Sequence, residues 1–202
     1  MGMPLKATGS EVSSLRAWYG GSIADFLKSS VDTIFAQLAK RNDFDLISTQ
    51  RDAWIEQIEF LRSSLNGLTG TLFLEFNIPR MGRRIDAVLL IGPVVFVVEF
   101  KVGENEFDRA AVEQVWDYAL DLKNFHEASH HASLVPILVA TNSKESGSNT
   151  LQVDADNVYR GGFKFEVRQL GRGYCPDISV PTQAPSTYGV RVCIETKMSS
   201  SL

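Results

Sequence analysis

Residues 84–101 have the sequence RIDAVLLIGPVVFVVEFK, in which two apolar, β-branched runs flank Gly92-Pro93. Two such runs separated by a short turn are typical of a β-hairpin. A tight turn centred on Gly92-Pro93 sets a register in which Asp86 on the first strand lies directly opposite Glu99 on the second. The sequence therefore predicts a hairpin with one acidic residue on each strand, at the end distant from the turn.

The acidic end of this hairpin predicts a cation site. Directly opposite residues have Cβ atoms about 4.5–5.5 Å apart on one face, and Lys101 shares that face with Glu99 because side chains alternate along a strand. Two charged carboxylates this close repel each other unless a cation lies between them. Mg²⁺ accepts one or two carboxylates together with water and phosphate oxygens, so Asp86, Glu99 and Lys101 suit phosphodiester hydrolysis. The same residues would also suit solvated strand ends that bind no metal.

The segments before the hairpin predict two helices and a strand. Ser22 followed by Asp25 resembles a capping box at the start of an amphipathic helix over 23–40. A second helix with one apolar stripe is expected over 50–65. Residues 71–78 have the composition of a strand.

The segments after the hairpin predict a helix over 109–126 and a buried strand over 134–140. Residues 163–167 and 190–194 alternate as strands do, although their irregular spacing gives them no place in the fold. The order helix, helix, strand, hairpin, helix, strand predicts an α/β sandwich in which helices flank a central mixed β-sheet.

Composition is that of an ordinary globular domain, with 202 residues, 44% hydrophobic and 22% charged. We expect a flexible Gly- and Ser-rich N-terminus over 1–20, a single domain over 21–197 and a short tail over 198–202. Two cysteines, Cys175 and Cys193, are too few for a disulfide framework and favour a cytoplasmic location. No apolar run reaches the ~18 residues of a membrane span. The net charge of −4 excludes a generally basic surface but not a local basic groove.

Three groups of residues together resemble the motifs of the PD-(D/E)xK nuclease superfamily. They are the segment around Asp86, the Glu99-Phe100-Lys101 tripeptide with its flanks, and Gln114-Val115-Trp116-Asp117-Tyr118. The last group resembles the Gln-x-x-x-Tyr helix of the RecB-type branch. More narrowly, the chain over about residues 50–141 is similar to a nuclease-like domain at the N-terminus of certain bacterial helicase-like proteins.

The resemblance implies a restriction-endonuclease-like sandwich and hydrolysis of DNA with Mg²⁺ or Mn²⁺ as cofactor. It assigns Asp86 and Glu99 to metal binding and Lys101 to catalysis. Gln114 and Tyr118 correspond to an accessory pair, and their spacing of four places them on one helical face.

Many members of the superfamily also use a glutamate from an early helix. Glu59 is the first candidate here, because it flanks the apolar stripe of the second helix. Glu56 on the same helix and Glu75 on the following strand are the alternatives, and the sequence does not choose among the three.

Basic residues cluster immediately before the first acid of the hairpin. Arg80, Arg83 and Arg84 could hold the DNA backbone, because the guanidinium fork matches phosphate geometry. A solvated turn, or pairing with Glu75, is the alternative. A zinc site at His126, with the other two histidines of the chain, is disfavoured because no further ligand of suitable spacing follows.

Two alternatives to a stand-alone nuclease stay open. The fold could serve as a module that binds nucleic acid or a partner protein without cleavage, since function depends on the site and not on the fold. The chain also has no G-x-x-x-x-G-K-[ST] phosphate loop, so it could be a fragment of a larger nuclease-helicase. A homodimer, a helicase module in the full-length or a partner protein, and a role in DNA repair or anti-phage defence are further expectations from the resemblance.

Overall fold

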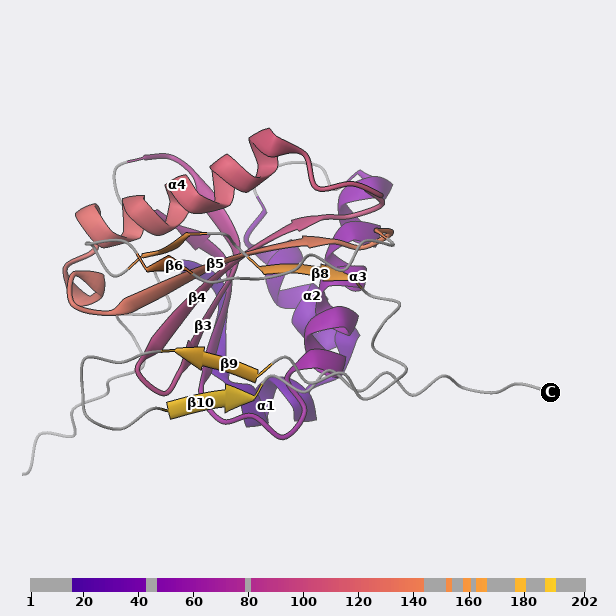
Figure 1. Ribbon diagram of the computed structural model, residues 1–202. Helices are drawn as coiled ribbons and strands as arrows, with labels where there is room; N and C mark the ends of the chain where they lie inside the picture. Colours follow the sequence, from indigo (N-terminus) through magenta and orange to yellow (C-terminus); the bar gives the residue numbers. More distant parts are fainter. Residues whose placement is uncertain are drawn as a thin grey trace, which may run out of the picture.

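A mixed β-sheet of six strands forms the centre of the computed structural model, which describes residues 16–42, 47–78, 81–143, 152–153, 158–160, 163–166, 177–180 and 188–191 (Figure 1). The strands in spatial order are β1 (Ala17–Ser22), β2 (Thr71–Asn77), β3 (Arg84–Ile91), β4 (Val94–Lys101), β5 (Ser133–Ala140) and β8 (Phe163–Glu166). The pairs from β1 to β4 are antiparallel, whereas β4, β5 and β8 run parallel.

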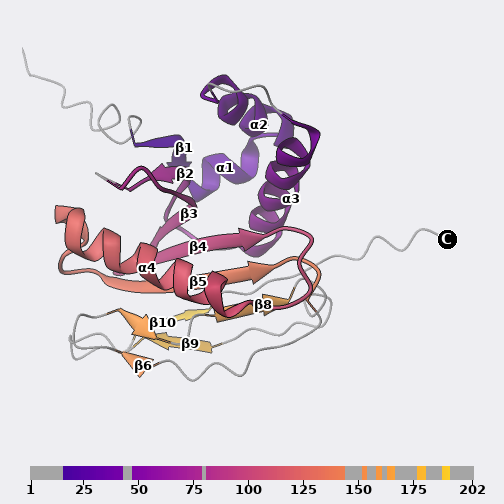
Figure 2. The same cartoon turned by 90° about the horizontal axis from the view of Figure 1, so that it is seen from above.

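Four α-helices in the described part of the chain cover this sheet. They are α1 (Ile23–Lys28), α2 (Val31–Lys40), α3 (Ser48–Ser64) and α4 (Arg109–Phe125), followed by a 3₁₀ turn, η2 (Glu127–Ser129). Figure 2 shows the first three helices grouped together and α4 lying apart from them along β4 and β5. The predicted class, an α/β protein with a mixed sheet and flanking helices, is confirmed. No helix in the described part of the chain is long and apolar enough to cross a membrane.

Two hydrophobic cores lie on opposite faces of the sheet. The N-terminal core packs the sheet against α1, α2 and α3, and it includes Phe26, Ile34, Trp54, Ile58, Leu74, Ala87, Phe96, Val98 and Phe100. The α4 core packs the sheet against α4, and it includes Phe76, Ile85, Val97, Val115, Tyr118, Ala119, Leu122 and Leu138. Because alternate residues of β4 enter the two cores, the strand has no solvent-facing apolar side.

The helix expected over 23–40 is interrupted, so the prediction of a single helix is wrong. Ser29 and Ser30 are both extended, with ψ of 145° and 156°. Ser30 starts α2 by accepting a hydrogen bond from the Thr33 backbone N–H, whereas Ser22 caps α1 as expected. Arg62 of α3 donates to backbone carbonyls at the end of α1, including that of Ser29. Serine competes with helical hydrogen bonds through its side chain, and Arg62 satisfies the carbonyls that the break exposes.

The prediction of a flexible N-terminus over residues 1–20 is wrong for residues 17–20, because they belong to the edge strand β1 (Ala17–Ser22). Ala17 and Tyr19 are buried there, and β1 pairs with β2. Residues 1–15 and the expected tail over 198–202 lie outside the described residues, as do both cysteines.

The other predicted elements are confirmed within a few residues. Helix α3 buries the expected stripe and ends before Gly67, which has a φ of +79°. The hairpin of β3 and β4 has the expected register from Ile91 opposite Val94 to Ala87 opposite Val98. Helix α4 and strand β5 also form as expected. Of the two C-terminal runs, the first contains β8 and the second overlaps β10 (Tyr188–Arg191), which pairs with β9 (Asp177–Val180); residues 167 and 192–194 of these runs lie outside the described residues. Strand β6 (Gln152–Val153) pairs with β7 (Tyr159–Arg160).

Candidate active site

The hydrogen-bonded ladder between β3 and β4 ends one residue before the predicted acid pair. Ala87 and Val98 form its last paired position. Beyond it, the Asp86 Oδ2 atom accepts a hydrogen bond from the Phe100 backbone N–H at 2.8 Å. The Asp86 carboxylate therefore supplies the acceptor for an N–H group of β4 where the strand ladder has stopped. The two acids are neighbours as predicted, but Asp86 and Glu99 do not form a ladder pair.

Four of the predicted residues form one hydrogen-bonded chain on the α4 side of the sheet. Lys101 Nζ donates to Glu99 Oε1 at 3.1 Å and to Gln114 Oε1 at 2.9 Å. The Gln114 amide nitrogen then donates to the Tyr118 hydroxyl at 2.7 Å. Residues four apart on α4 therefore face the end of β4, and the amide of Gln114 connects the lysine to the tyrosine.

Burial gives the two acids unusual electrostatics. The pKa of Asp86 lies well above its ordinary value because the carboxyl is desolvated, and the nearby charge of Glu99 raises it further. The pKa of Glu99 is also raised by desolvation, although the Lys101 ammonium opposes this shift. Each buried carboxyl thus resists ionisation, and a cation close to both would favour their charged forms.

A third acid, Glu75, lies beside Asp86. Its backbone has a φ of +53°, in a region that residues other than glycine seldom adopt. Leu74 and Phe76 would share a face in a regular strand, yet they enter opposite cores here. Glu75 is buried, and it accepts hydrogen bonds from Trp54 Nε1 and Arg84 Nε, each at 2.8 Å. Local strain of this kind persists only where surrounding contacts maintain it.

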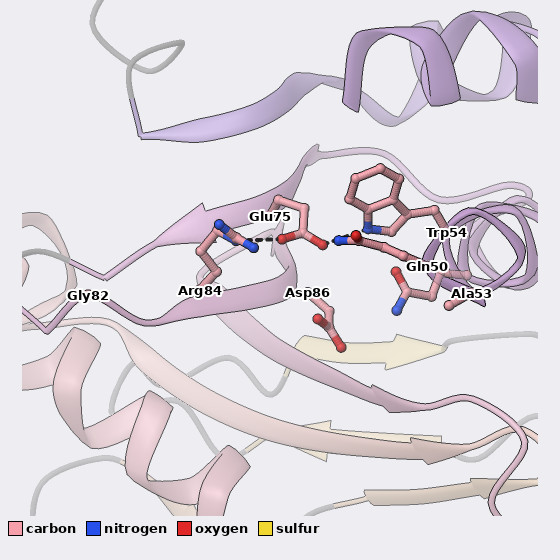
Figure 3. Close-up of a pocket in the computed structure, with 8 residues that line it drawn as sticks. Gln50, Ala53, Trp54, Glu75, Gly82, Arg84 and Asp86 are labelled. Atoms are coloured by element: carbon pink, nitrogen blue, oxygen red, sulfur yellow. Dashed lines mark hydrogen bonds and ion pairs between the residues drawn. The ribbon is translucent and has the colours of Figure 1, made fainter. Parts of the chain in front are cut away.

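A cavity of about 420 Å³ opens next to these residues (Figure 3). Gln50, Ala53 and Trp54 approach it from α3, whereas Glu75, Arg84 and Asp86 approach it from β2 and β3; Gln57 and Gly82 complete its lining. Sequence analysis missed the two glutamines. Their spacing of seven residues on the polar edge of α3 was the available signal, because residues i and i+7 share a helical face.

The glutamates proposed for the site have different positions in the structure. Glu59 and Glu56 are both exposed on α3, and neither lines the cavity beside Asp86. Glu75 does line that cavity, and its charge raises the pKa of Asp86 and Glu99. Among the three candidates, Glu75 is therefore the one that the fold brings to the acid pair.

The predicted arginines divide between two environments. Arg84 forms an ion pair with Glu75, and its guanidinium lies 4.3 Å from the centroid of the Trp18 ring. Arg83 is exposed, and its charge lowers the pKa of Asp121 on α4 against the dominant effect of desolvation. Arg80 lies outside the described residues. The alternative interpretation, in which Arg84 pairs with Glu75, is thus present in the structure.

The donor set at the acid pair suits a hard cation. Glu99 Oε2 is buried and has no hydrogen-bond partner within the described ranges, and carboxylate oxygens are the ligands that Mg²⁺ prefers. No group of three or more histidine, cysteine or acidic side chains in those ranges has the arrangement of a protein-only metal cage. An ion held by Asp86 and Glu99 would therefore need water or substrate oxygens as its remaining ligands.

Comparison with known proteins does not extend this description. No protein-family model matches the chain, and no curated protein or solved structure matches it at a significant level. The fold and the side-chain geometry define an α/β protein with a carboxylate, lysine and amide cluster at the end of two central strands.

Proposed function

We propose that this chain is a metal-dependent nuclease of the PD-(D/E)xK type that hydrolyses DNA phosphodiester bonds, on a restriction-endonuclease-like sandwich. The observation that carries the proposal is the lysine at the end of β4, whose ammonium group contacts both Glu99 and Gln114 close to Asp86. The mixed sheet between two helical layers supports the fold assignment.

Asp86 and Glu99 are the residues that would hold Mg²⁺ or Mn²⁺. When bound, the ion would lower the pKa of an attacking water and offset negative charge on the phosphate. The Glu99 Oε2 atom, which has no hydrogen-bond partner among the described residues, and the raised pKa values of both carboxyls support this role, because a buried acid without a cation prefers to keep its proton.

Lys101 would stabilise charge at the reacting phosphate. An ammonium group has three N–H donors, and contacts with Glu99 and Gln114 use two of them. The third donor would orient the attacking water or bind a phosphoryl oxygen. Gln114, held in turn by Tyr118, fixes the lysine in position.

The direct experiment is cleavage of circular and linear DNA with Mg²⁺, with Mn²⁺ and with a chelator. We expect cleavage that requires either metal, and we expect Lys101→Ala to abolish it without loss of folding. Lys40→Ala, which removes an exposed lysine at the end of α2, is the matched control and should cleave normally. DNA binding without cleavage under any divalent metal would instead support a non-cleaving module, and undiminished cleavage by Lys101→Ala would contradict the assignment.

A further inference from the structure

The cavity beside Asp86 has features of a binding site. Its volume of about 420 Å³ lies within the range of pockets that hold small organic groups. On the α3 side, Gln50, Ala53 and Gln57 all line the cavity, and Ala53 contributes the shortest side chain of the three. All three residues are only partly buried, so their side chains can reach a group that enters the cavity.

The charges of the residues that line the cavity argue against a phosphate as its occupant. Glu75 and Asp86 both line the cavity; the Glu75 charge would oppose an anion, and so would Asp86 whenever it is ionised. Arg84 also lines it, but its guanidinium is paired with Glu75. A neutral group is therefore the better occupant, and anionic groups would stay at the acid pair, where a cation could bind.

The amide side chains favour a planar group with both donors and acceptors. Each glutamine offers a carbonyl oxygen and an NH₂ group, and such amides can form paired hydrogen bonds with the edge of a nucleobase. The Trp54 indole N–H is already bonded to Glu75, so Gln50 and Gln57 are the lining residues of α3 whose polar groups could bind an incoming base.

We propose that this cavity receives the unpaired base of the nucleotide adjoining the scissile phosphate. The inference rests on the proposed nuclease function and adds a substrate class to it. A base within an intact duplex is stacked and paired, and its release has an energetic cost. Single-stranded DNA, or a frayed DNA end, is therefore the preferred substrate over a closed duplex.

The test compares cleavage of one oligonucleotide as a single strand and as a closed duplex. A third substrate is the same single strand with an abasic site next to the cleaved bond. We expect wild-type protein to cleave the normal single strand about tenfold faster than either of the others, as the loss of one paired hydrogen-bond contact with a base edge predicts. Ala53→Leu fills the cavity with a good helix-forming residue. It should cleave the normal strand about tenfold more slowly than wild type and lose the difference between normal and abasic strands.

Ala36→Leu is the matched control, because Ala36 is an exposed alanine on α2 that does not line the cavity. It should keep the wild-type preference. If Ala53→Leu fails to fold, Gln57→Leu, which removes one amide at similar volume, replaces it with the same expected loss of discrimination. Equal cleavage of duplex, single and abasic strands by wild type would overturn the base pocket and leave the nuclease function intact.

A binding measurement separates the two proposals if no DNA is cleaved. Wild-type protein in Ca²⁺ or chelator is titrated with fluorescently labelled normal strands and with labelled strands whose bases are all removed. A base pocket predicts about tenfold tighter binding of the normal strand, and Ala53→Leu should remove that difference. Equal affinities would overturn the pocket whatever the result for catalysis.

Discussion

The Asp86 carboxylate accepts a 2.8 Å hydrogen bond from the backbone N–H of Phe100. Phe100 separates Glu99 from Lys101, and its ring lies in the N-terminal core on the opposite face. A side chain of β3 thus holds the segment of β4 that carries the other two site residues. Asp86 has two separable roles in this arrangement, as a proposed ligand and as the fixed partner of the neighbouring strand.

Substitution of Asp86 by asparagine and by alanine distinguishes these roles. Asparagine keeps an oxygen acceptor for the Phe100 N–H, whereas alanine leaves that N–H without its partner. We expect both variants to lose cleavage, and we expect Asp86→Ala to be less stable than Asp86→Asn by about 1–2 kcal/mol, the effect of an unsatisfied buried donor. Urea denaturation measures the difference, and equal stability of the two variants would show that the hydrogen bond does not order β4.

The raised pKa of Asp86 predicts how the stability of the metal-free protein depends on pH. Desolvation favours the protonated carboxyl in the folded state, so the folded state binds more protons than the unfolded chain between the ordinary aspartate pKa and the higher folded pKa. The free energy of unfolding should therefore fall as the pH rises through that interval.

Asp86→Asn isolates this contribution, because other carboxyls in the protein also titrate in the same range. As the pH rises from acid to neutral, the unfolding free energy of wild type should fall relative to that of Asp86→Asn, because the variant has no carboxyl to ionise at this position. Urea unfolding at several pH values in the presence of a chelator measures it. A difference that does not change with pH would mean that Asp86 titrates normally.

Divalent metal should reverse this loss of stability at neutral pH. A ligand that binds only the folded state stabilises it by about 2.7 kcal/mol at a hundred times its dissociation constant. We expect Mg²⁺ or Mn²⁺ to raise the unfolding free energy of wild type and to have little effect on Asp86→Asn or Glu99→Gln. Thermal melts over a metal titration provide the measurement.

Glu59→Gln is the matched control for the metal titration, because Glu59 is an exposed acid on α3 that does not line the cavity. This variant should respond to metal as wild type does. If it lost the metal effect instead, the early-helix glutamate expected from the sequence would be a ligand after all.

Local pattern was sufficient to predict the hairpin and the shared face of Glu99 and Lys101, whereas Gln114 and Tyr118 were candidates through the family resemblance. The Gly92-Pro93 turn fixes the register, and strand alternation then places Glu99 and Lys101 on the side of α4 that carries Gln114. The hairpin and the shared face of Glu99 and Lys101 depend on spacing within a few residues, so they can be inferred without knowledge of the remaining fold. The contact between Lys101 and Gln114 depends on where α4 packs against the sheet and comes from the structure.

Features that depend on tertiary contacts could not be predicted in the same way. A φ of +53° at Glu75 has no signal in the residue type, since glycine or asparagine is usual there. The backbone carbonyl of Ser29, at the break between α1 and α2, accepts a hydrogen bond from Arg62, which is distant in sequence. Strand β1 begins in a segment whose composition resembles a flexible terminus, and its pairing with β2 overrides that local preference.

The ion pair between Glu75 and Arg84 should respond unequally to removal of its two members. The side chain of Glu75 is 9% exposed and that of Arg84 is 41% exposed. Removing Arg84 leaves a buried charge without its cation, whereas removing the charge of Glu75 leaves an arginine that water can still solvate. Arg84→Met should therefore destabilise the protein by about 2 kcal/mol, and Glu75→Gln, which keeps an acceptor for Trp54, by about 1 kcal/mol.

The double variant tests the origin of this asymmetry. With both charges removed, no unpaired buried charge remains, so the loss of stability should be smaller than the sum of the two single losses. Urea denaturation of the four proteins gives the coupling free energy directly. Additive effects would mean that Glu75 and Arg84 act independently. The strained backbone at Glu75 would then be maintained by its hydrogen bond to Trp54 and by packing of the flanking Leu74 and Phe76, not by the ion pair.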